Sequence, residues 1–160
     1  MPEEIIRNYF NRQPFSDNKL SIFEHDCKDK GCELKGNFED YIILNGDNIK
    51  RCLKINQKSV DRIIFTKKAS NNKLDIILCE LSGGKKRYTD VVKKVRYSGE
   101  YILKIFNEYG FKINDFVCIY LGNYKNENRL LITPFSIPGF HRNDIMINHA
   151  RCGSDISEFV

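Results

Sequence analysis

The stretch that decides the fold is residues 59–86, SVDRIIFTKKASNNKLDIILCELSGGKK. Two apolar runs, 59–68 and 73–82, lie on either side of a polar break at 69–72, a pattern that predicts a β-hairpin. The centre of each run is almost continuously apolar rather than alternating, as is typical of strands that are covered on both faces. We therefore expect this hairpin at the middle of a layered α/β domain.

Each run also carries one acid, since Asp61 opens the first run and Glu80 closes the second. A hairpin can bring the two carboxylates close together, because its strands pair side by side and their side chains alternate between faces. Carboxylates are costly to place at the edge of a core, so this pair suggests a site for Mg²⁺ or Mn²⁺. The alternative is that both acids meet solvent or pair with nearby lysines, such as Lys58, Lys67 or Lys86.

The rest of the chain supplies further elements of an α/β pattern. We expect a helix over 3–12, an irregular excursion over 21–37, and strands over 50–56 and 114–122. Residues 38–48 are predicted to form a further strand that runs into a turn at Asn45-Gly46. The clearest helix covers 89–109, where apolar residues form one stripe and the basic residues lie opposite or beside it, exposed to solvent. The whole chain, 1–160, is predicted to be one α/β domain with a mixed β-sheet flanked by helices, a core over 38–122 and a β-rich C-terminal extension over 129–160.

The composition is ordinary, with 160 residues, 41% hydrophobic and 29% charged. Neither a long apolar run nor a signal-like start is present, so we expect a cytoplasmic protein without a membrane span. The net charge of +5 says little, but basic residues gather between residues 85 and 96: Lys85, Lys86, Arg87, Lys93, Lys94 and Arg96. A basic segment beside an acidic pair is what binding a polyanion requires, although a solvated helix face has the same composition.

Six cysteines are spread along the chain: Cys27, Cys32, Cys52, Cys79, Cys118 and Cys152. Without a signal peptide a disulfide framework is a poor default, so we expect reduced thiols, with Cys79 and Cys118 as small core residues. His25, Cys27 and Cys32 could begin a structural zinc site, but the sequence offers no second close pair of ligands. A zinc-stabilised adaptor is therefore the weakest of the alternatives.

Across residues 59–122 the chain resembles the PD-(D/E)xK nuclease superfamily, whose core is a strand with Asp, a hairpin to a strand with Glu-x-Lys, a helix and another strand. The same order is seen here in VDRIIF, IILCELS, the helix over 89–109 and FVCIYLG. The resemblance implies a restriction-endonuclease-like core that hydrolyses phosphodiester bonds in DNA or RNA, with Asp61 and Glu80 as ligands of Mg²⁺ or Mn²⁺. It also implies a possible homodimer, because many small nucleases dimerise to cut both strands.

The chain departs from the superfamily's motif at the lysine, because Ser82 stands in its place. A serine hydroxyl carries no positive charge, so Lys85 or Lys86 would have to replace the lysine after a sharp turn at Gly83-Gly84. The backbone of the nucleic acid would then be contacted by Arg87, Lys93, Lys94 and Arg96.

Two readings of the site therefore stay open. One is a metal-dependent nuclease, and the other is a catalytically inactive nuclease fold that binds nucleic acid or protein. In both, tyrosines near the lysines could stack on unpaired bases, and the candidates are Tyr88, Tyr97 and Tyr101.

Overall fold

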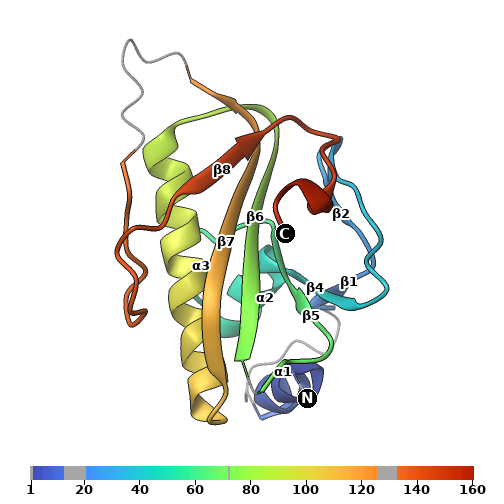
Figure 1. Cartoon of the computed structure of the whole chain (residues 1–160), viewed down its shortest axis with the longest axis vertical. Helices are drawn as coiled ribbons and strands as arrows, with labels where there is room; N and C mark the ends of the chain where they lie inside the picture. Colours follow the sequence, from blue (N-terminus) through green and yellow to red (C-terminus); the bar gives the residue numbers. More distant parts are fainter. Residues whose placement is uncertain (1, 13–20, 72, 126–132) are drawn as a thin grey trace.

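A mixed β-sheet is the centre of the molecule in the computed structural model, which describes residues 2–12, 21–71, 73–125 and 133–160. Six strands form the sheet in the order β1-β4-β5-β6-β7-β8 (Figure 1). Their bounds are β1 Phe23–Glu24, β4 Tyr41–Asn45, β5 Arg62–Thr66, β6 Lys73–Lys86, β7 Lys112–Tyr124 and β8 Ile147–Ala150. Neighbours from β1 to β6 are antiparallel, whereas β6, β7 and β8 are parallel to one another. The predicted α/β class with a mixed sheet is thus confirmed.

The hairpin predicted from residues 59–82 is formed by β5 and β6, which pair with Ile63 opposite Leu78 and Ile64 opposite Ile77. Ile63 and Leu78 are buried in one hydrophobic cluster, and Ile64 and Ile77 are buried in a second cluster. Because successive strand residues point to opposite faces, the continuously apolar runs reflect a sheet that is covered on both sides.

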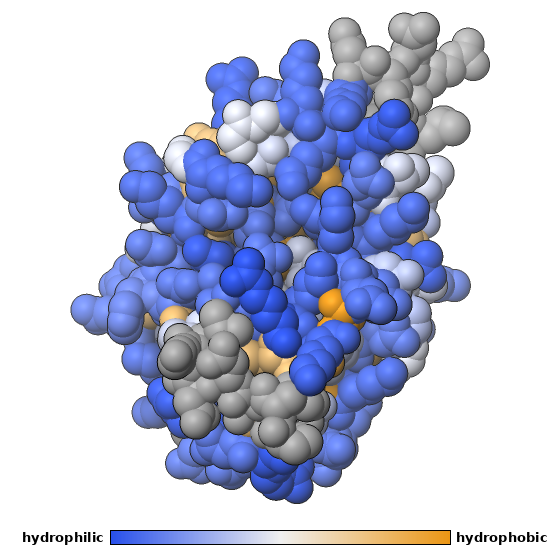
Figure 2. Space-filling model, turned by 180° about the vertical axis from the view of Figure 1, so that it is seen from behind, coloured by the Kyte–Doolittle hydropathy of each residue, from blue (hydrophilic) through white to orange (hydrophobic). Residues whose placement is uncertain are grey.

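Within the described ranges, three helices cover one face of the sheet: α1 (Pro2–Asn11), α2 (Gly46–Leu53) and α3 (Tyr88–Glu108). The long helix α3 runs beside β6 and β7, which it connects (Figure 1). Its bounds agree with the helix predicted over 89–109. The side of the molecule opposite to the view of Figure 1 is mostly hydrophilic, and hydrophobic residues surface there only in small separated areas (Figure 2).

The other face is covered without an α-helix in the described part of the chain, so the expectation of a sheet flanked by helices holds for one side only. A second, two-stranded sheet lies there, made of β2 (Cys27–Asp29) and β3 (Cys32–Leu34). The C-terminal segment, with the 3₁₀ helix η1 (Ile156–Glu158), packs into the same hydrophobic cluster. The region 21–37, predicted to be irregular, therefore contains β1 and this small hairpin.

The strand predicted over 50–56 is wrong, because these residues fall in and after α2. Asn45 and Gly46 looked like a turn, but the Asn45 side chain accepts a hydrogen bond from the Asn48 amide at 3.0 Å and caps a helix. Gly46 lies so close to the segment that leads into β5 that a Cβ there would sit 1.8 Å from the Val60 carbonyl oxygen. A residue with a side chain could not occupy this position without moving the backbone.

In the residues that the structure describes, the C-terminal extension adds one strand, β8, to the sheet. Its other β-structure is two isolated bridges, one between Phe135 and Ile145 and one between Asp155 and Lys35. The beginning of the predicted extension, up to residue 132, lies outside the described residues. No helix in the described ranges is both long enough and apolar enough to cross a bilayer.

Candidate catalytic site

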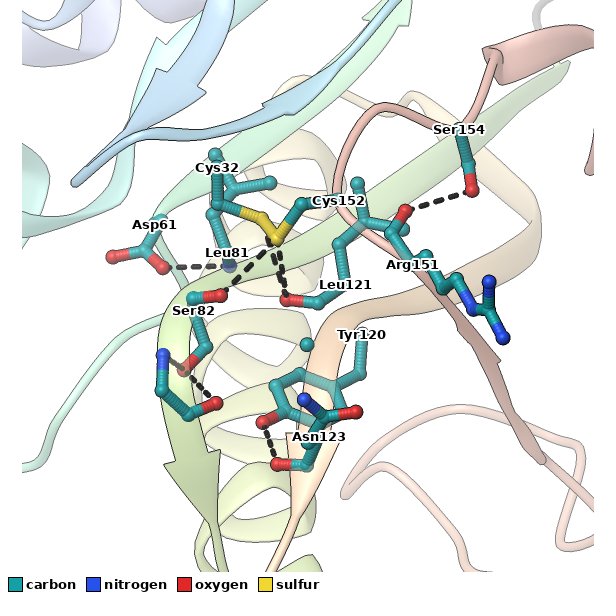
Figure 3. Close-up of a disulfide and its surroundings, with 12 residues drawn as sticks. Cys32, Asp61, Leu81, Ser82, Tyr120, Leu121, Asn123, Arg151, Cys152 and Ser154 are labelled. Atoms are coloured by element: carbon teal, nitrogen blue, oxygen red, sulfur yellow. Dashed lines mark hydrogen bonds between the residues drawn. A yellow bond between two sulfur atoms is a disulfide. The ribbon is translucent and has the colours of Figure 1, made fainter.

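Asp61 and Glu80 lie side by side, as the sequence predicted. β5 begins at Arg62, which pairs with Cys79 of the antiparallel β6, so Asp61 just before β5 lies beside Glu80 on the helix-covered face. Both are buried, with 5% of Asp61 and none of Glu80 exposed. The Leu81 amide donates to Asp61 Oδ2 at 2.7 Å, a contact drawn in Figure 3. The backbone of β6 therefore fixes the orientation of the Asp61 carboxylate.

A buried polar network holds the chain that leads to Asp61 against α3. The Ser59 hydroxyl lies 3.0 Å from the Ser98 hydroxyl and 2.7 Å from the Tyr101 hydroxyl. The Val60 amide donates to Ser98 Oγ at 2.9 Å. Ser98 lies one helical turn beyond Lys94 on α3. The part of α3 that holds the segment before Asp61 therefore also positions Lys94.

Two lysines neutralise Glu80. Lys86 Nζ donates to Glu80 Oε2 at 3.0 Å, and Lys94 Nζ forms an ion pair with the same oxygen. The Lys86 side chain is 24% exposed and the Lys94 side chain 15% exposed. The expectation that the basic residues of the long helix are exposed is therefore wrong for Lys94, which belongs to the site.

The predicted sharp turn at Gly83-Gly84 is also wrong, because β6 continues through both glycines. The register with β7 shifts between Leu81 and Lys85, so residues 82–84 bulge opposite Gly122 alone. The bulge brings Lys86 onto the face of Glu80, whereas Lys85 is exposed and makes no described contact with either acid. A Cβ at Gly83 would come within 2.8 Å of the Lys30 carbonyl oxygen, so the bulge needs glycine there.

Burial and crowding of charge set the protonation of the acidic pair. Burial, together with the adjacent Glu80 carboxylate, raises the pKa of Asp61 to about 8. Burial alone would raise the pKa of Glu80, but a hydrogen bond with Asp61 and the charges of Lys94 and Lys86 hold it below its ordinary value. Near neutral pH the pair thus keeps one proton on Asp61, which can donate to Glu80.

The lysines respond to the same crowding in opposite directions. Burial and the neighbouring charge of Lys86 lower the pKa of Lys94, although Glu80 opposes the shift. Partial burial would lower the pKa of Lys86, but a hydrogen bond with Lys94 and the interactions with Glu80 raise it above its ordinary value. Lys94 is therefore the cation of the site that loses its proton more readily.

Asp61 and Glu80 offer part of the donor set of a hard divalent cation. Glu80 Oε1 is buried and has no hydrogen-bond partner while Asp61 is ionised, so one carboxylate oxygen is left to bind a proton or a cation. Carboxylate oxygens are the ligands that Mg²⁺ and Mn²⁺ prefer. In the described part of the chain, no group of three or more His, Cys, Asp or Glu side chains is placed to hold a metal ion. Backbone carbonyls and water would have to complete the coordination of an ion at Asp61 and Glu80.

A disulfide lies next to this site, contrary to the expected reduced thiols. Cys32 of β3 is bonded to Cys152, which follows β8 (Figure 3). Cys152 Sγ lies 3.2 Å from the Ser82 carbonyl oxygen, two residues beyond Glu80. The bond also removes Cys32 from the zinc site considered with His25 and Cys27. The other four cysteines are buried, and Cys79 and Cys118 are core residues as predicted.

A basic groove of about 530 Å³ opens above the two lysines of the site. It is lined by Gln57, Asp90, Tyr97 and seven cations: Lys58, Lys85, Lys86, Arg87, Lys93, Lys94 and Lys125. Arg96 does not line it, but borders a smaller neighbouring pocket with Lys93. The predicted nucleic-acid contacts therefore divide between two adjoining depressions, and the groove reaches the acids through Lys86 and Lys94.

Comparison with protein-family models, curated proteins and solved structures gave no match. Any proposal for the protein's function therefore rests on the geometry of the site. Sequence reasoning missed Lys94 as a partner of Glu80, although a signal was present. Lys94 is three residues after Val91 and four before Ser98, so it lies at the margin of the buried stripe of α3.

Proposed function

We propose that the protein is a metal-dependent nuclease of the PD-(D/E)xK type, with a restriction-endonuclease-like core and a lysine supplied by α3 instead of the motif position held by Ser82. The observation that carries the proposal is the buried cluster of Asp61, Glu80, Lys86 and Lys94 at the base of a basic groove. Buried acids paired with lysines of altered pKa in a concave basic site are typical of catalytic centres.

Asp61 and Glu80 would hold Mg²⁺ or Mn²⁺, which when bound activates water and neutralises charge on a scissile phosphate. Asp61 would have to give up the proton that it carries near neutral pH, and the positive charge of the ion would compensate for the second ionised carboxylate. Lys86, whose pKa is raised, stays charged and attracts the phosphate. The groove cations above it hold the flanking phosphates of the nucleic-acid backbone.

Lys94 is the residue that we assign to the role of the missing lysine. Its Nζ contacts the Glu80 carboxylate, and its lowered pKa increases the fraction of neutral amine that can accept a proton from water. In its charged form it would stabilise the negative charge that builds on the phosphate during hydrolysis. Lys85, which does not reach Glu80, is left as a groove residue.

The test is cleavage of labelled single-stranded and duplex DNA and RNA in the presence of Mg²⁺ or Mn²⁺. Wild type should cleave at least one substrate and should stop in excess EDTA, whereas Glu80→Gln should lose at least about 100-fold in rate. Asp75→Asn is the matched control, because Asp75 is an exposed acid on the same strand. Equal cleavage by wild type and Glu80→Gln, or cleavage that persists in EDTA, would contradict the proposal.

A second candidate is a nucleic-acid-binding module without catalysis. It is favoured by the complete burial of Glu80 beneath Lys86 and Lys94, an arrangement that satisfies its charge without a metal ion. This candidate predicts binding that needs no divalent cation and weakens steeply with salt. Tight binding in EDTA together with no cleavage of any substrate would favour it, and absence of binding to all nucleic acids would exclude it.

Two further expectations stay predictions, the cytoplasmic location and the homodimer. The Cys32–Cys152 bond is typical of oxidising compartments, and a reducing cytosol would keep it open unless it has a redox role. Alkylation of free thiols in freshly lysed cells would show which state exists there. Light scattering on the purified protein with and without nucleic acid would show whether it dimerises.

A further inference from the structure

The basic groove above the candidate site contains one aromatic side chain, Tyr97, in addition to its seven cations. Tyr97 is 39% exposed. Among the described residues, the large hydrophobic side chains that are exposed are Tyr97, Met146 and Val160, and of these only Tyr97 is aromatic. It lies on α3 four residues after Lys93 and three after Lys94, so all three project from neighbouring turns. An exposed ring thus shares one wall of the groove with its cations.

The other two tyrosines considered for stacking are unsuited to it. Tyr88 and Tyr101 are 7% and 9% exposed, and their hydroxyls bond to the Thr133 carbonyl and to Ser59. Both therefore belong to the packing between α3 and the rest of the fold. Tyr97 alone of the three is left to contact a ligand.

A ring beside a row of cations recognises a particular form of nucleic acid. The cations attract any phosphate backbone, but an aromatic ring can stack only on a base whose face is free. In a duplex the bases are stacked on one another, so Tyr97 would have no partner there. The volume of the groove, about 530 Å³, lies within the range of sites that enclose small ligands, which is roughly 300–1,000 Å³. Such a pocket suits one or two unpaired nucleotides.

We propose that the groove binds single-stranded nucleic acid, with an unpaired base stacked on Tyr97 and adjacent phosphates held by Lys58, Lys93 and Lys125. This inference rests on the proposed function, because it specifies which form of nucleic acid the nuclease site would receive as substrate. Lys86 and Lys94 line the groove and also contact Glu80, so a phosphate held there lies one side chain away from the acidic pair. Stacking on Tyr97 would set which phosphate occupies that position.

The test is binding without catalysis, measured by fluorescence anisotropy in EDTA. The probes are a short labelled DNA strand, the RNA strand of the same sequence, and the blunt DNA duplex. We expect the strands to bind more tightly than the duplex, and Tyr97→Ala to weaken strand binding by about 5- to 150-fold. Tyr97→Phe keeps the ring and should bind like wild type. Duplex binding, which needs no stacking, should change little in either variant.

The lysines provide an independent arm of the same experiment. Lys93→Met should reduce the slope of log affinity against log salt for the strand by about 0.7, because one phosphate contact is lost. Lys104→Met is the matched control, since Lys104 is an exposed lysine on α3 that pairs loosely with Glu100. An unchanged salt slope in Lys93→Met would remove Lys93 from the interface.

The proposal is overturned if the duplex binds as tightly as the strand or if Tyr97→Ala binds the strand normally. These outcomes are distinct from failure of the proposed function. Strand binding that needs Tyr97, without cleavage of any substrate, would support the groove and reject the nuclease. Cleavage of duplex by wild type and Tyr97→Ala alike would support the nuclease and reject single-strand recognition.

Discussion

Removal of the Cys32–Cys152 disulfide should destabilise the protein strongly without changing its fold. The bond closes a loop with a sequence separation of 120. Chain entropy for a loop of that length gives about 5 kcal/mol of stabilisation at 25 °C, at the upper end of measured disulfide effects. For a chain of this size, that loss corresponds to a fall of roughly 10–20 °C in Tm.

The folded state should keep its shape because other contacts hold the same two segments together. The Lys35 amide donates to the Ser154 carbonyl at 2.9 Å, and the Gly153 amide donates to the Glu33 carbonyl at 2.7 Å. The Ile156 amide donates to the Lys35 carbonyl at 2.8 Å, and the Ile156 side chain is buried. The bond therefore acts mainly by restricting the unfolded chain.

The assay is denaturant and thermal unfolding, followed by circular dichroism, of wild type and of the Cys32→Ser/Cys152→Ser variant, each with and without dithiothreitol. Reductant should bring wild type to the stability of the variant and leave the variant unchanged, so the variant is its own control for the other four cysteines. The reasoning is refuted if reductant lowers the unfolding free energy of wild type by less than about 1 kcal/mol, well below the usual disulfide range. It is also refuted if alkylation of the native, unreduced protein finds six free thiols.

The protonation of Asp61, metal binding at the acidic pair and the role of Lys94 can each be tested separately. The pKa of Asp61 is raised to about 8 in the folded protein, so the stability that its proton contributes is complete below the pKa of the unfolded chain and is lost as pH rises through about 8. The Tm of wild type should therefore fall between about pH 5 and pH 9. The Tm of Asp61→Asn should fall less over the same range. Mn²⁺ should raise Tm more at about pH 9 than at about pH 5, because at low pH the ion competes with the proton on Asp61. Equal increases in Tm at the two pH values would argue against binding of the ion at Asp61 and Glu80. Lys94→Met should lower cleavage by about 100-fold or more, whereas Lys104→Met, an exposed lysine on the same helix, should leave it unchanged.

The hairpin at the centre of the fold could be predicted from sequence because its signal is local. The apolar runs around Ile63 and Ile77, with a polar break between them, specify two buried strands, and the alternation of side chains then brings Asp61 beside Glu80. Helix α2 was missed because Asn45-Gly46 suits a turn as well as a helix start, and only the packing of Gly46 on Val60 separates the two.

The other parts of the site depend on contacts between residues distant in sequence. Cys32 and Cys152 meet only because β3 and the segment after β8 cover the same face of the sheet. Lys86 reaches Glu80 through a bulge that a Gly-Gly pair permits but does not specify. Lys94 reaches it because α3 crosses β6 at that level, which periodicity alone does not fix.

The most direct test of the central claim, that Asp61 and Glu80 form a divalent metal site, is a crystal structure of the protein soaked in Mn²⁺, with anomalous data collected. The account predicts a manganese peak bound by both carboxylates, with Glu80 Oε1 as a ligand and the Lys94 amine still at the site. The same crystals of Glu80→Gln should lack the peak. An intact Glu80 ion pair with both lysines and no peak between the acids, at saturating Mn²⁺ and a pH above 8, would contradict the claim.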